Sequence, residues 1–147
     1  MARSVNPRAL QDVLRDQEPS SGVVVSSSAA RTSTSAHNSA DQTNRDHIGV
    51  YVFLDFNAGS DSSGSVQVSI QAKTPGGSYV DIFTGSSFAP STLANIKSYL
   101  ISPSGSTKTD GALVGISSAP LPRVWRVQIN RGDTGRSLDY SIEAMYV

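Results

Sequence analysis

The stretch Ile48-Gly-Val-Tyr-Val-Phe-Leu-Asp-Phe56 decides the fold class of this chain. Every second residue from Ile48 to Phe56 is large and apolar, which is the period of a β-strand. Tyr51 and Phe53 alternate with these residues, so both faces of the strand are partly apolar. A strand that is apolar on both faces is typical of the middle of a sheet.

The same period of two returns further along the chain, with turn-rich segments between the apolar stretches. The further strands that this pattern predicts are 66–73, 79–83, 112–118, 125–129 and 138–146. Short loops favour an antiparallel meander of the strands 48–56, 66–73 and 79–83, and the loop 130–136 is expected to close a hairpin. The sequence therefore predicts an all-β fold, an antiparallel, jelly-roll-like β-sandwich of about six to eight strands.

The segment 91–101 fits two patterns. Leu93, Ile96 and Leu100 approximate helical spacing, whereas residues 98–102 also suit a strand, so both alternatives remain open. The following prolines, Pro120 and Pro122, exclude regular ladder pairing around residue 121.

Residues 1–46 are expected to form an extended N-terminal arm before a β-sandwich domain at residues 47–147. The arm contains one expected short helix at residues 7–16, with Asn6 as its cap and Pro7 in its first turn. The helix carries a narrow apolar stripe of Leu10, Val13 and Leu14. An isolated helix of this length is marginal in water. The stripe is therefore expected to dock, either on its own β domain or on a neighbouring subunit.

The rest of the arm is rich in serine and threonine and cannot form a core alone. Its apolar triplet, Val23, Val24 and Val25, has strand propensity and predicts a short edge strand or a strand added to another sheet. The arm therefore carries two apolar elements that suit assembly with a neighbour.

Composition excludes several classes of function. The chain has 147 residues, no cysteine, and twelve basic residues balanced by twelve acidic ones. A neutral chain lacks the basic excess of a nucleic-acid-binding protein. The absence of cysteine excludes thiol nucleophiles and Cys-ligated metals. Neither a membrane span nor a secretory signal is recognisable, so synthesis in a cytoplasm is expected.

No catalytic constellation is visible. His37 and His47 are the histidines, and neither has a nucleophile motif beside it; Glu18 and Glu143 are the glutamates and do not suggest a facing pair. The series from Asp55 to Asp61 begins like a calcium loop but has Val66 where a glutamate belongs. We therefore expect no enzyme activity, no metal and no cofactor.

Four aromatic side chains lie opposite the main apolar stripes of their strands: Tyr51, Phe53, Tyr79 and Phe83. They suit the second face of a sandwich, a protein interface or a surface on which ligands stack. With the arm residues, they complete the candidate partner-binding set, which is Leu10, Val13, Leu14, Val23, Val24, Val25, Tyr51, Phe53, Tyr79 and Phe83.

Residues 29–147 resemble a family of small bacteriophage virion proteins. The resemblance is carried, in order, by Ala30-Arg-Thr-Ser-Thr-Ser35, Gly49-Val-Tyr-Val-Phe-Leu-Asp-Phe56, Val66-Gln-Val-Ser-Ile-Gln-Ala-Lys73, Gly77-Ser-Tyr-Val-Asp-Ile-Phe83, Leu121-Pro-Arg-Val-Trp-Arg-Val-Gln-Ile129 and Asp139-Tyr-Ser-Ile142. It implies a non-enzymatic β-sandwich subunit of a phage particle, encoded among head genes. The sequence departs from the family pattern in residues 84–118, and the arm before Ala30 is not covered.

The sequence thus leads to the expectation of a capsid decoration or cement protein on the virion surface. Its partners would be the major capsid protein and further copies of itself, without nucleic acid or membrane. The alternative is a receptor- or carbohydrate-binding module of a phage tail or fibre. That module would use the four aromatic side chains, or the loops 102–111 and 130–136.

Overall fold

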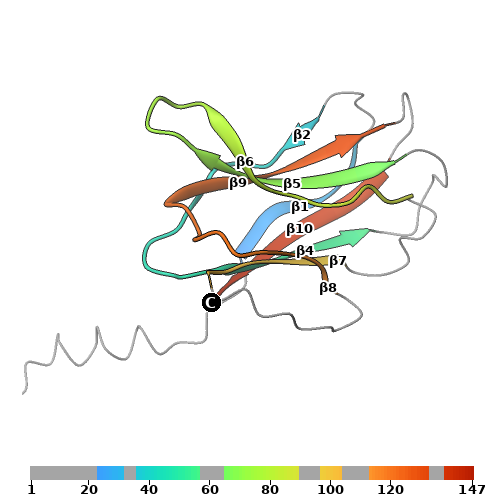
Figure 1. Ribbon diagram of the computed structural model, residues 1–147. Coiled ribbons are helices and arrows are strands. Elements are labelled where there is room, and N and C mark those ends of the chain that lie inside the picture. Colours follow the sequence, from blue (N-terminus) through green and yellow to red (C-terminus); the bar gives the residue numbers. More distant parts are fainter. Residues whose placement is uncertain (1–22, 32–35, 57–64, 90–96, 104–112, 133–137) are drawn as a thin grey trace, which may run out of the picture.

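The regular secondary structure of the protein is entirely β-strand in the part that the computed structural model describes (Figure 1). The described residues are 23–31, 36–56, 65–89, 97–103, 113–132 and 138–147. Their strands form two layers that face each other, which confirms the expected all-β sandwich. The helix expected at residues 7–16 lies outside the described residues.

The first layer, sheet A, has the strand order β1-β10-β4-β7-β8. Its strands are β1 (Val23–Arg31), β4 (Val50–Phe56), β7 (Lys97–Ile101), β8 (Leu113–Ser117) and β10 (Leu138–Tyr146). Neighbouring strands are antiparallel except β7 and β8, which are parallel. The open alternatives for residues 91–101 are thus resolved for 97–101, which form a strand.

The second layer, sheet B, has the order β2-β9-β5-β6, and β3 also pairs with β9. Its strands are β2 (His37–Asn38), β3 (Gln42–Thr43), β5 (Val66–Lys73), β6 (Tyr79–Thr84) and β9 (Val124–Arg131). All of their pairings are antiparallel.

The pairings are nested along the chain. The first strand pairs with the last, β1 with β10; β2 and β3 pair with β9, β4 pairs with β7, and β5 with β6. The chain therefore folds as one long hairpin that is rolled into two layers, with β8 added at the edge of sheet A.

The core lies between the layers, where the alternating apolar residues of both sheets meet. In β4 the side chains of Val50, Val52, Leu54 and Phe56 point inward and are buried. Trp125 of β9 is fully buried opposite them. Each such side chain stabilises the fold by about 1.5–3 kcal/mol through its removal from water. Sequence reasoning placed these residues on the inner faces correctly, but Ile48, expected in the same stripe, precedes β4 and is 65% exposed.

Two expected pairings are wrong. The strand 48–56 does not continue into a meander with 66–73, because β4 lies in sheet A between β10 and β7 whereas β5 and β6 form a hairpin in sheet B. Similarly, the loop 130–136 connects β9 to β10 across the two layers and closes no hairpin. Alternation reveals which face of a strand is buried, but it does not reveal which strand lies beside it.

The boundary expected after residue 46, between the arm and the β-sandwich domain, also differs in the structure. Residues 23–31 form β1 on the edge of sheet A, and residues 37–43 supply β2 and β3 on the edge of sheet B. The sheets thus include these segments of the expected arm. Val23–Val25 do form an edge strand, as expected, but this strand pairs with β10 of the same chain.

Candidate functional site

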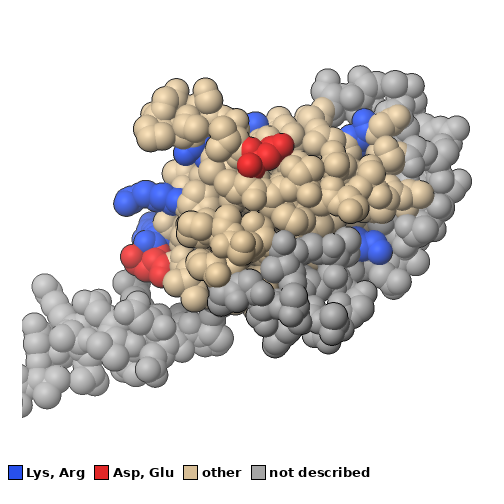
Figure 2. All heavy atoms as spheres, viewed as in Figure 1, with Lys and Arg blue, Asp and Glu red and all other residues tan. Residues whose placement is uncertain are grey.

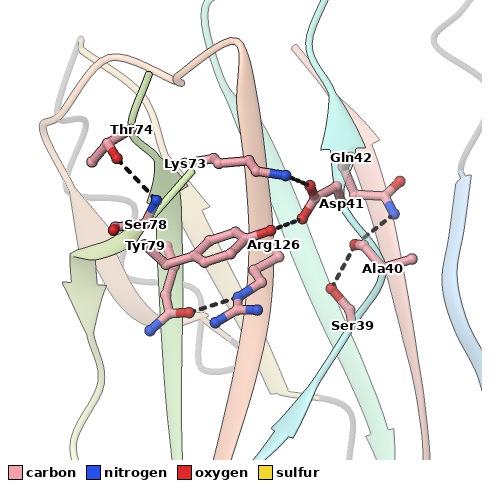
Figure 3. Close-up of polar contacts among 10 residues, drawn as sticks. Ser39, Ala40, Asp41, Gln42, Lys73, Thr74, Ser78, Tyr79 and Arg126 are labelled. Carbon is pink, nitrogen blue, oxygen red and sulfur yellow. Dashed lines mark hydrogen bonds and ion pairs between the residues drawn. The ribbon is translucent and has the colours of Figure 1, made fainter. Parts of the chain in front are cut away.

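The outer face of sheet B carries a network of hydrogen-bonded polar side chains (Figure 3). Asp41, which precedes β3, points toward β5 and β6 and forms an ion pair of 2.7 Å with Lys73. The Tyr79 hydroxyl donates a hydrogen bond to the same carboxylate. The Arg126 guanidinium lies 3.4 Å from the centre of the Tyr79 ring, in a cation–π contact.

These contacts change the pKa values of two side chains. The hydrogen bonds from Lys73 and Tyr79 lower the pKa of the Asp41 carboxyl, and the Asp41 carboxylate raises the pKa of Lys73. Both side chains are near the surface, so solvent screens the pair. The cluster therefore fastens the segment before β3 to β5 and β6 weakly.

The network continues along the strands through side-chain amides. Arg126 Nε donates to Gln71 Oε1 at 2.8 Å, and Gln71 Nε2 donates to Asp81 Oδ1 at 2.8 Å. Gln128 Nε2 donates to Asn38 Oδ1 at 2.9 Å. Several polar side chains of this face thus hydrogen-bond to one another.

The outer face of sheet A is different, because it carries apolar side chains beside the carboxylates of Asp55, Asp139 and Glu143. In β4, Tyr51 and Phe53 point away from the core, and their rings are nearly parallel at 16° with centres 6.1 Å apart. The β10 partner of Tyr51 is Met145, which is 37% exposed. The β10 partner of Phe53 is Glu143, whose β1 partner is Val24 at 62% exposure.

The apolar surface extends to the end of the chain. Val147 pairs with Gly49 through two backbone hydrogen bonds of 3.0 Å and is 41% exposed. A Cβ atom on Gly49 would lie 2.5 Å from the Ile101 carbonyl oxygen, which explains why glycine occupies this position. We define the apolar face as Val24, Tyr51, Phe53, Met145 and Val147.

Exposed apolar side chains are distributed unevenly between the layers. The large ones among the described residues are Val23, Val24, Ile48, Val80, Met145 and Val147, and of these only Val80 belongs to sheet B. Figure 2, in the orientation of Figure 1, shows Lys, Arg, Asp and Glu side chains of the described residues at scattered positions among uncharged residues. Because large exposed apolar patches in soluble proteins mark interaction sites, the apolar face is the candidate functional site.

The structure does not bring the four expected aromatic side chains together. Tyr51 and Phe53 lie on sheet A, whereas Tyr79 belongs to the polar network of sheet B. Phe83 is half-buried and packs against Tyr99, with ring centres 5.6 Å apart. The aromatic set therefore divides between two layers, and no single platform forms.

The candidate partner-binding residues of the arm also do not lie together on one surface of the described structure. Val25 is part of the core, Val23 and Val24 are exposed on β1, and Leu10, Val13 and Leu14 lie outside the described residues. Sequence reasoning missed Met145 and Val147. The alternation of 138–146 contains the signal for Met145, because it places Met145 on the face opposite Tyr146.

Both histidines pack against tyrosine rings. His37 Nδ1 lies 2.7 Å from the Tyr140 hydroxyl oxygen, and the His47 ring stacks on Tyr146 at 4.8 Å between centres. Among the described residues, no three His, Asp or Glu side chains gather in a way that could hold a metal ion. The same residues include no helix long and apolar enough to span a membrane.

Comparison with known proteins gives no relative. No family model, no curated protein and no solved structure matches the chain.

Proposed function

We propose that the protein is a non-enzymatic structural component of a bacteriophage virion, a decoration or cement protein that binds neighbouring major capsid subunits and stabilises the head. The observation that carries this proposal is the apolar face, which spans β1, β10 and β4 on one layer only. The opposite layer presents hydrogen-bonded polar groups to water. Such asymmetry suits a rigid body that lies with one layer against a protein surface.

The strand order supports the same proposal. Nested pairing of first with last strand, in two layers, is the order of a jelly roll, an architecture found in viral capsid and lectin domains. Fold alone does not define function. The proposal therefore combines this architecture with the apolar face and with the resemblance to phage virion proteins in the order of sequence segments.

The test is binding of the purified protein to particles that lack it. Replacing Tyr51 and Phe53 together by serine removes two half-buried aromatic side chains from the β4 side of the apolar face. Since buried aromatic residues dominate interface energies, binding should weaken by at least about tenfold. Val80→Ser is the matched control, because Val80 is 50% exposed and lies on sheet B. Equal binding by the wild type and the double variant would overturn the proposal.

A carbohydrate- or receptor-binding module of a tail or fibre is the second candidate. The near-parallel Tyr51 and Phe53 rings favour it, because sugars stack on exposed aromatic rings and lectins share the architecture. The copy number in purified particles separates the candidates. A cement protein is present in many copies per head and a tail module in few, and gel densitometry measures the difference.

A further inference from the structure

The apolar face lies where the described chain begins. Val23 pairs with Ala144, the neighbour of Met145, and Val24 is itself part of the face. The 22 residues that precede Val23 therefore join sheet A at the edge of this apolar surface. Any apolar element in those residues is tethered beside it.

Such an element is present in the sequence. Leu10, Val13 and Leu14 form one stripe of the expected helix, whereas the charged residues of the segment, Arg8 and Arg15 among them, fall on other sides at 100° per residue. A helix of ten residues is too short to be stable alone and needs an apolar surface.

The lengths match. Residues 17–22 can span up to about 20 Å when extended. The distance from β1 across β10 to β4 is two strand spacings, about 10 Å. A ten-residue helix is about 15 Å long and would cover about three strands. The tether is thus long enough to place the stripe over Tyr51, Phe53 and Met145.

We propose that residues 7–16 cover the apolar face of their own chain in the free protein, with Leu10, Val13 and Leu14 against Tyr51, Phe53 and Met145. Tethering gives the segment an effective concentration on the order of 1 mM at this face. A second copy present at about 10 µM is therefore a hundredfold weaker competitor. This inference rests on the proposed function. On binding, the capsid would displace residues 7–16 from the apolar face. Both the stripe of Leu10, Val13 and Leu14 and the apolar face would then be free to contact capsid protein.

Disulfide trapping tests this contact, and the chain suits it because it contains no cysteine. In the full-length chain, Leu14→Cys is combined with Phe53→Cys and the protein is oxidised at about 10 µM. The intramolecular disulfide should exceed disulfide-linked dimer by about a hundredfold. The control combines Leu14→Cys with Val80→Cys on sheet B and should form no intramolecular disulfide above background. Covalent dimer as the main product, or equal trapping in test and control, would overturn the proposal.

A second measurement does not depend on the cysteines. Changing Leu10 and Leu14 to serine in the full-length chain should uncover the apolar face and increase the fluorescence of a dye that binds apolar surfaces. Adding Phe53→Ser should reduce the fluorescence again. An unchanged signal in the first variant would contradict the contact. Particle binding by the wild-type protein is scored separately, so the contact and the proposed function can fail independently.

Discussion

Tyr99 in β7 carries a buried hydroxyl group with no hydrogen-bond partner among the described residues. Burial without a partner raises the pKa of Tyr99 to about 12. Above pH 10 the unfolded chain releases the Tyr99 proton while the folded chain retains it, so stability should fall as the pH rises toward 12. The loss from this group is on the order of 2 kcal/mol by pH 12.

Tyr99→Phe should therefore reduce the loss of stability between pH 10 and pH 12. At pH 7 the same change should be neutral or stabilising, because it removes an unsatisfied buried hydroxyl. Urea unfolding of the wild type and the variant at pH 7, 10 and 12 measures this. A variant that loses several kcal/mol at pH 7 would show that the hydroxyl has a partner.

For Asp41 we expect the opposite dependence of stability on pH. Its pKa is lowered by the hydrogen bonds from Lys73 and Tyr79, so the carboxylate contributes stability above its ordinary value of 3.8. This contribution is lost as the pH falls through the lowered pKa of the folded state. In Asp41→Asn, the decline of the urea midpoint below pH 4 should be shallower than in the wild type. Parallel declines would show that the ion pair does not stabilise the fold.

At the scale of elements, the turn between β5 and β6 depends on a single glycine. Gly77 has a φ of 87°, a conformation that side chains disfavour, and its N–H donates to the Thr74 carbonyl at 2.9 Å. Gly77→Ala should destabilise the protein by about 1 kcal/mol. Gly76→Ala is the control, because its φ is not positive and a Cβ there would approach only Thr74 Oγ1, at 3.9 Å. Thermal unfolding compares the two variants, and equal stabilities would contradict the assignment of the turn.

Elements were predictable from sequence where alternation was strong. The strands 48–56, 66–73 and 138–146 were expected within two residues of their ends, because their inward residues are all apolar and, apart from Ala72 and Ala144, large. The partner of each strand was not predictable. The pairing of β4 with β10 joins segments far apart in the chain, and period-two patterning contains no information about such neighbours.

The candidate site was predictable only in part for the same reason. Tyr51 and Phe53 were identified from their positions opposite the apolar stripe of one strand. Their union with Met145, Val24 and Val147 depends on the register of β1, β10 and β4, which only the structure provides. Tyr79 and Phe83 shared the same local pattern but lie in another layer.

At the scale of the whole molecule, the two layers present different side chains to their surroundings. Sheet A exposes the apolar face, and sheet B exposes a polar network whose members bind one another. A body built in this way has one preferred orientation on a protein surface, because burial of the apolar face gains free energy while burial of the polar network gains little.

Cryo-electron microscopy of intact particles carrying the protein tests this orientation most directly. Density for the sandwich should place sheet A, with Tyr51, Phe53 and Met145, against the capsid, and sheet B, with Tyr79 and Arg126, toward solvent. A sandwich that contacts the particle through sheet B, or that occupies the tail alone, would contradict the account.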